Sequence, residues 1–140
     1  MGSTWRGPAQ DVIDQSKTDW VGLWSLLDAT AHAAMALSLV LPLGASVDLA
    51  FAAIDLGEAR EELEWVRPEL TCLAPVRLGP LHLSDDVGAA RVVLEQMVSA
   101  AIDLTINLGD VGGEPGELRA LGRVLSKLRD SIEELARAAA

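Results

Sequence analysis

Residues 115–135 read PGELRALGRVLSKLRDSIEEL, and apolar side chains recur in this stretch at every third or fourth position. The recurring residues are Leu118, Leu121, Leu125, Leu128, Ile132 and Leu135. On an α-helix this spacing gathers the apolar side chains on one face. The charged residues between them, including Glu133 and Glu134, are expected on the opposite, solvated face. The stretch therefore predicts a helix that packs one face against other helices.

Three further stretches have the same spacing of apolar residues and predict three further helices. The first is expected to start between residues 9 and 19 and to end near residue 41, where proline and glycine interrupt the pattern. The second is expected at about 46–66, with Ser46 as its N-cap. The third is expected at about 84–108, with Ser84 as its N-cap.

The composition agrees with a helical fold. Half of the 140 residues are hydrophobic, aromatic residues are few and tyrosine is absent, so the core must consist mainly of aliphatic side chains. The length fits one domain with a core of its own. We therefore expect an all-α four-helix bundle built as two helical hairpins. Residues 9–140 are expected to form this single domain, and residues 1–8 a flexible leader.

The connection between the two expected hairpins, residues 68–83, is long and rich in apolar residues. Apolar residues at 76, 78, 81 and 83 alternate with Arg77 and His82 around Gly79-Pro80. This alternation suits either a small β-hairpin or an extended strap across the bundle. Long ordered loops often carry function, so the connection is one candidate location for a site. The plain alternative is a hydrophobic cover over one end of the core.

Acidic residues outnumber basic residues by 21 to 11, and the formal net charge is −10. This charge repels a phosphate backbone and an anionic membrane surface, so neither nucleic acid nor a membrane is expected as a partner.

Residues 29–47 carry no Asp, Glu, Lys or Arg, which raises the question of a membrane span. However, the acidic residues Asp28 and Asp48 flank this stretch and a proline interrupts it, which favours buried bundle helices over a membrane span. Cys72 is the only cysteine, and the cytoplasm is the expected location.

The sequence lacks the patterns of common catalytic and cofactor sites. The Glu-x-x-His spacing of dinuclear metal bundles is absent, and the chain has only two histidines. No recognisable motif surrounds Cys72, and the glycines at 109–116 lack the Lys-Ser/Thr ending of a phosphate loop. We therefore expect no metal and no cofactor, and the residues leave open whether the protein is an enzyme.

Two hypotheses from different classes agree with these features. In the first, the protein is a non-enzymatic helical interaction module that forms a homodimer or binds another helical protein. The first expected helix is apolar over most of its circumference, and Trp20 and Trp24 on it are the candidate interface residues. We favour this hypothesis because most polar residues of the chain fall into outward-facing stripes.

In the second hypothesis, the helices and the 68–83 connection enclose a cavity for an apolar small molecule, in a binding protein or a small enzyme. Arg77 and His82 would orient a polar group of this ligand, with help from His32 and Asp28 on the first helix. His32 follows Asp28 by four residues, which places both side chains on one helical face.

Overall fold

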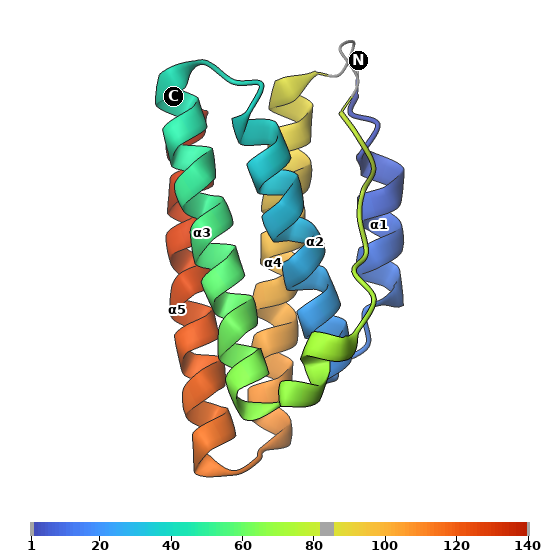
Figure 1. The fold of residues 1–140 in the computed structure, drawn as a ribbon, viewed down its shortest axis with the longest axis vertical. Coiled ribbons are helices and arrows are strands. Elements are labelled where there is room, and N and C mark those ends of the chain that lie inside the picture. The colour runs from blue at the N-terminus through green and yellow to red at the C-terminus, as the bar shows by residue number, and fades with distance from the viewer. Residues whose placement is uncertain (1, 82–85, 140) are drawn as a thin grey trace.

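The protein is all-α in its computed structural model, which describes residues 2–81 and 86–139 (Figure 1). Within these ranges the chain forms α-helices and a short 3₁₀-helix, and no strand. The elements are α1 (Arg6–Gln15), α2 (Trp20–Ser38), α3 (Leu43–Val66), η1 (Pro68–Cys72), α4 (Val87–Val111) and α5 (Pro115–Ala138). The structure confirms the predicted all-α class.

The long helices α2, α3, α4 and α5 lie side by side along the long axis of the molecule (Figure 1). α2 and α3 form one antiparallel pair, joined by a turn at residues 39–42, and α4 and α5 form another, joined at residues 112–114. α3 also packs against α5, and α2 packs against α4. The shorter α1 packs against α4 and α2, and the segment that follows η1 runs alongside it (Figure 1).

Local sequence signals explain several helix ends. Asp19 caps α2, and its Oδ1 accepts a hydrogen bond from a backbone N–H of the first turn at 2.6 Å. Asp86 caps α4 in the same way at 3.1 Å. Gly112 ends α4 with a φ of 91°, a left-handed conformation that glycine adopts without strain. α5 begins at Pro115, as the sequence predicted.

The N-terminal region differs from the expected flexible leader over residues 1–8. α1 begins at Arg6, and Trp5 is 1% exposed, with its indole Nε1 donating a hydrogen bond to Gly79 O at 2.9 Å. The first expected helix is also divided, because residues 16–19 interrupt it before Asp19 caps α2. The reason is long-range: the 68–83 connection supplies the surface on which Trp5 packs, and nothing within residues 1–8 reveals that surface.

The predicted N-cap of the second helix is wrong. α3 begins at Leu43 directly after Pro42, so Ser46 lies inside its first turn. Proline already restricts φ to the range found at a helix start, which explains the earlier beginning. α3 ends at Val66, as predicted. Ser84, the predicted cap of the third helix, lies outside the described residues.

Aliphatic side chains from all the long helices form the core. α2 is its central element, because most of the circumference of this helix is buried. The buried face of α5 includes Val124, Ser131 and Glu134, which lie outside the predicted apolar seam, whereas Leu118 of that seam is exposed. The prediction that Glu134 faces solvent is therefore wrong, because packing against α3 and α4 rotates the buried face of α5.

Residues 73–81, which we call the strap, run as an extended segment between η1 and the start of α4 (Figure 1). Leu78 is buried and Leu81 packs partly against the core. The described part of the 68–83 connection contains no strand, so the β-hairpin that the sequence allowed does not form there. The strap bonds to side chains of other elements instead. His82 and the residue after it lie outside the described residues.

Among the described residues, α4 alone is long and apolar enough to match a membrane span by length and composition. A buried helix of a soluble protein meets the same criteria, so this match carries little weight. The uncharged stretch 29–47 is divided between α2 and α3 by the turn at residues 39–42.

Candidate functional site

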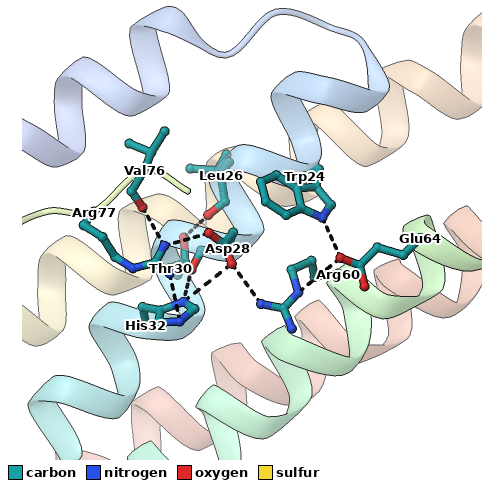
Figure 2. Close-up of polar contacts among 9 residues, drawn as sticks. All are labelled: Trp24, Leu26, Asp28, Thr30, His32, Arg60, Glu64, Val76 and Arg77. Atoms are coloured by element: carbon teal, nitrogen blue, oxygen red, sulfur yellow. Dashed lines mark hydrogen bonds and ion pairs between the residues drawn. The ribbon is translucent and has the colours of Figure 1, made fainter. Parts of the chain in front are cut away.

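A buried carboxylate on α2 joins three elements of the structure. Asp28 is 3% exposed, and a buried charge needs a counter-charge and hydrogen bonds. Arg60 of α3 supplies one, because its Nη1 donates to Asp28 Oδ1 at 2.8 Å. Arg77 of the strap supplies another, because its Nη1 donates to Asp28 Oδ2 at 2.7 Å. Asp28 therefore ties the strap to the α2–α3 pair (Figure 2).

His32 lies one turn after Asp28 and completes the contact with the strap. Its Nε2 is 3.0 Å from Arg77 Nη2, and its Nδ1 is 2.9 Å from Asp28 O. A guanidinium group has only donors, so Nε2 must accept a hydrogen bond from Arg77. The proton of the neutral imidazole is then on Nδ1, which donates to the backbone oxygen of Asp28. Both ring nitrogens of His32 are thus engaged, one with the strap and one with its own helix (Figure 2).

Arg60 extends the network to a second carboxylate. Its Nε is 3.8 Å from Glu64 Oε2, and the indole Nε1 of Trp24 donates to the same oxygen at 2.9 Å. Arg60 Nε is buried and has no hydrogen-bond partner within the described ranges. We call Asp28, His32, Arg60, Glu64 and Arg77 the Asp28 cluster. Its carboxylates and guanidinium groups sum to zero charge while His32 is neutral.

The structure brings together Asp28, His32 and Arg77, which the sequence named as ligand-binding candidates, whereas His82 lies outside the described residues. Sequence reasoning missed Arg60 and Glu64. A signal was present, since Asp28 is the only acidic residue between positions 20 and 47 and Arg60 the only Lys or Arg between positions 20 and 66. Two such isolated opposite charges on adjacent apolar helices are expected to pair.

A pocket of about 280 Å³ lies beside the Asp28 cluster, between the strap and α2. We call it the strap pocket; its lining residues are Trp5, Ala29, His32, Ala33, Ala36, Arg77, Leu78 and Gly79. Alanine and leucine side chains and the Trp5 ring make its walls apolar, whereas His32 and Arg77 are about half exposed and polar. The second sequence hypothesis expected a ligand cavity under the 68–83 connection, and binding of a ligand in this pocket stays a prediction.

A larger hollow of about 390 Å³ lies at the turn between α1 and α2, where Lys17, Asp19 and Val76 contribute to its lining. Its most ordered polar group is the Asp19 carboxylate, which already caps α2. Among the described residues, no group of three or more His, Cys, Asp or Glu side chains could hold a metal ion. Cys72 is exposed.

The candidate interface residues Trp20 and Trp24 are both engaged within the chain. Trp24 is 5% exposed and bonded to Glu64, so it offers no surface to a partner. Trp20 is partly buried, and the guanidinium of Arg67 lies 5.0 Å from the centre of its ring. α2 is apolar on nearly all sides because it is central to the fold.

One continuous row of exposed apolar side chains lies on α3. Large apolar side chains on its outer face follow one another at intervals of four, four and three residues, which aligns them along one side of the helix. We call these residues the α3 face: Leu43, Val47, Phe51 and Ile54, all of them exposed. Leu39 and Val40, in the turn before α3, are exposed as well. Sequence reasoning identified the buried side of α3 and overlooked this second apolar side.

A second buried carboxyl group lies on α5. Glu134 is 7% exposed, and its Oε1 has no hydrogen-bond partner within the described ranges. Burial and then the neighbouring Asp55 carboxyl group raise the pKa of Glu134 to about 8. Nearby, Lys127 Nζ is 2.8 Å from Glu58 Oε2 and 3.9 Å from Asp55 Oδ1, and the bond to Glu58 raises the pKa of Lys127.

The chain shows no likeness to known proteins from which a function could be carried over. No protein-family model, curated protein or solved structure matches it.

Proposed function

We propose that the protein is a non-enzymatic helical interaction module that forms a homodimer through the α3 face. The observation that carries this proposal is a row of exposed Leu43, Val47, Phe51 and Ile54 side chains on a helix whose opposite side is already buried. Contiguous exposed apolar side chains of this kind mark interaction surfaces. The proposed interface therefore lies on α3 and not at Trp20 and Trp24, which the sequence indicated. The proposed class of function is the one that the sequence favoured.

A second copy of the chain fits this face despite the net charge of −10. Carboxylates of α3 on and beside the apolar row are partly neutralised by α5, since Arg137 Nε lies 3.4 Å from Asp48 Oδ1 and Lys127 Nζ lies 2.8 Å from Glu58 Oε2 and 3.9 Å from Asp55 Oδ1. Local repulsion between two such faces is therefore small compared with the repulsion that the total charge suggests.

The charge pattern along α3 selects an antiparallel, two-fold symmetric contact. Glu58 and Glu61 continue the α3 face toward the C-terminal end of the helix. In an antiparallel crossing centred on Phe51, Glu58 lies opposite Gly44 of the second copy, because each is seven positions from Phe51. Glutamate is favourable at the positive N-terminal end of a helix dipole. A parallel crossing would align the two glutamate rows, which repel each other.

The expected affinity is modest. Full burial of one Leu, Val, Ile or Phe side chain stabilises by about 1.5–3 kcal/mol, and the α3 face residues are already partly covered. A symmetric dimer buries all four twice, against an association cost of about 4–15 kcal/mol. The association cost cancels much of this gain, so we expect a weak dimer whose dissociation constant is no lower than micromolar.

We also propose that α2 to α5 act as a four-helix bundle of two helical hairpins, to which α1 and the strap are added. The packing of α3 on α5 and of α2 on α4 supports this arrangement. It leaves the outer side of α3 free at the edge of the bundle, where a second copy can reach it.

The experiment is a pair of matched valine substitutions measured by sedimentation velocity over a range of concentrations. Val47→Glu on the α3 face and Val92→Glu on α4 start from side chains of similar exposure, 44% and 40%. The unchanged protein and Val92→Glu should dimerise alike, and Val47→Glu should remain monomeric with an unchanged circular dichroism spectrum. An unchanged protein that stays monomeric at high micromolar concentration would overturn the proposal, as would equal dimerisation of both variants.

A further inference from the structure

The strap pocket combines an apolar interior with one polar edge. Trp5 and Leu78 are buried side chains of its walls, and alanines of α2 leave the space between helix and strap. His32 and Arg77 form the polar edge, with Nε2 and Nη2 only 3.0 Å apart. A pocket with this division of surface suits a ligand that is apolar at one end and polar at the other.

Arg77 keeps unused hydrogen-bond donors at this edge. Its Nη1 donates to Asp28 Oδ2 at 2.7 Å and to Val76 O at 3.1 Å, and its Nη2 donates to His32 Nε2. A guanidinium group has five N–H donors, so Nε–H and one N–H of Nη2 remain without a partner within the described ranges. Nε and one terminal nitrogen form the fork that binds a carboxylate through two hydrogen bonds.

The charge of the Asp28 cluster predicts how an added anion would be compensated. The cluster sums to zero while His32 is neutral, so a bound carboxylate would leave one uncompensated negative charge. The charged groups that face His32 are Asp28 from its own helix, 3.6 Å from Nδ1, and Arg77 from the strap, with Arg60 of α3 across Asp28. Protonation of His32 at Nε2 would restore the balance and turn Nε2 from an acceptor into a second donor.

We propose that the strap pocket binds a small monocarboxylate with an apolar body, whose carboxylate is held jointly by Arg77 and by His32 in its protonated form. The carboxylate accepts hydrogen bonds from the free Nε–H and Nη2–H of Arg77, and His32, protonated from the solvent at Nε2, stops accepting from Arg77 and donates a further charge-assisted hydrogen bond to the carboxylate. The volume of about 280 Å³ limits the apolar body to a single ring or a short branched chain. This ligand site goes beyond the proposed homodimer and does not depend on it.

Benzoate is a suitable probe, and benzamide is its neutral control of the same shape. Both are titrated into the full chain and followed by the backbone amide of Gly79 and the indole Nε1–H of Trp5 in nitrogen-15 correlation spectra. We expect saturable shifts at these two reporters and binding of benzoate at least about tenfold tighter than that of benzamide. Equal binding of the two compounds, or no saturable shift with benzoate, would overturn the proposal.

Two variants separate binding from general damage to the fold. Ala36→Leu fills the pocket and leaves the Asp28 cluster intact, and Ala100→Leu enlarges a similarly half-buried alanine on α4. Arg77→Gln removes the guanidinium, with Arg91→Gln of α4 as its control. Ala36→Leu and Arg77→Gln should each weaken benzoate binding about tenfold or more, whereas both controls retain it. Unchanged binding in Ala36→Leu would show that benzoate binds elsewhere and would overturn the proposal.

The protonation step has its own readout. Benzoate stays ionised between about pH 5.5 and pH 8, whereas a histidine changes its charge in this range, so binding should be tighter at the lower pH. His32→Ala should lose this pH dependence. Equal affinity at both pH values would overturn the role of His32. Val47→Glu should bind benzoate as the unchanged protein does, so failure of the homodimer proposal and failure of the ligand proposal are distinguishable.

Discussion

Asp28 of α2 and Glu134 of α5 are both buried carboxyl groups, but their neighbours carry opposite charges. Asp28 accepts hydrogen bonds from Arg60 and Arg77. Glu134 faces the carboxyl group of Asp55, and its pKa is raised to about 8. Similar burial thus produces a charged anchor in one place and a carboxyl group that is protonated at neutral pH in the other. The counter-charge, more than the depth of burial, decides which role a buried acid takes.

The two groups also differ in what they hold together. Asp28 joins the strap, α2 and α3, three elements that are far apart in the sequence. Glu134 lies where α5 packs against α3, next to a residue of the same sign. Removing the charge of Asp28 should therefore lower the free energy of unfolding. Removing the ionisable group of Glu134 should raise the free energy of unfolding at pH values where Glu134 would otherwise be charged. Three substitutions test this contrast, in order of decreasing effect.

The largest effect is expected for Asp28→Asn. The amide keeps the shape of the carboxylate but leaves the charges of Arg60 and Arg77 without their buried partner. Removing one member of a buried ion pair costs about 3–5 kcal/mol, and because both arginines keep some contact with water we expect a loss of about 3 kcal/mol in the free energy of unfolding. Urea denaturation at neutral pH measures this loss.

Asp103→Asn is the matched control for Asp28→Asn, because Asp103 is exposed on α4. It should change the free energy of unfolding by less than about 0.5 kcal/mol. If Asp28→Asn were equally harmless, the Asp28 cluster would contribute nothing to holding the strap, and the contrast with Glu134 would fail.

A smaller effect of opposite sign is expected for Glu134→Gln. The pKa of Glu134 is raised to about 8 in the folded protein, above its ordinary value of 4.5, so the folded state holds a proton that the unfolded state has lost between these values. This contribution is fully present below about pH 4.5 and is lost as the pH rises to about 8. Glutamine cannot ionise, so the variant should be more stable than the unchanged protein above pH 8. The full shift would correspond to about 5 kcal/mol, but water that reaches the ionised carboxylate reduces this penalty, so we expect a gain of about 2 kcal/mol.

The measurement for Glu134→Gln is the free energy of unfolding at several pH values from 5 to 9. The difference between variant and unchanged protein should grow in favour of the variant as the pH rises. Glu133→Gln, which replaces the exposed neighbour, should show no such trend. Parallel curves for Glu134→Gln and the unchanged protein would mean that Glu134 is ionised without penalty.

The two acids also show which parts of the candidate site could be predicted from the sequence. Asp28 was identified by its spacing from His32, which predicted that the two side chains share a helical face. Arg77 was identified by the alternation of the strap. The sequence named Arg77 and Asp28 as candidates for one site but did not indicate the ion pair between them. The path of residues 73–81 is decided by packing across the whole fold rather than by local spacing.

Glu134 was missed for a different reason. The residues of α5 fit two apolar seams that are rotated relative to each other, one through Leu125 and Ile132 and the other through Val124 and Ser131. Regular spacing does not choose between them. The choice is made by contact with α3 and α4, which buries Glu134. In the same way, Trp5 could not be placed in the core before the strap was known to cover it.

The smallest effect is expected for Glu117, a partly exposed acid that has an arginine partner. Nε and Nη2 of Arg67 donate to Glu117 Oε2 at 2.9 and 2.7 Å, and these bonds, together with the backbone N–H of Glu114, lower the pKa of Glu117. Arg67→Gln should raise the pKa of Glu117 toward its ordinary value, though not fully, because the bond from Glu114 remains. A carbon-13 titration of the Glu117 carboxyl group measures this change.

Arg129→Gln is the control for Arg67→Gln, since it removes an exposed arginine of α5 and should leave the titration of Glu117 unchanged. The stability of the protein should respond little to either variant, because water reaches both members of the Arg67–Glu117 pair, and loss of the contact between Arg67 and the Trp20 ring adds only a small cost. Arg67 thus resembles Arg60 and Arg77 in its geometry toward a carboxylate, and the difference lies in the carboxylate: the Glu117 side chain is 20% exposed and that of Asp28 is 4% exposed. A large loss of stability in Arg67→Gln would contradict this view: it would mean that an arginine partner matters equally in water and in the core, and that the burial of Asp28 is not what makes it an anchor.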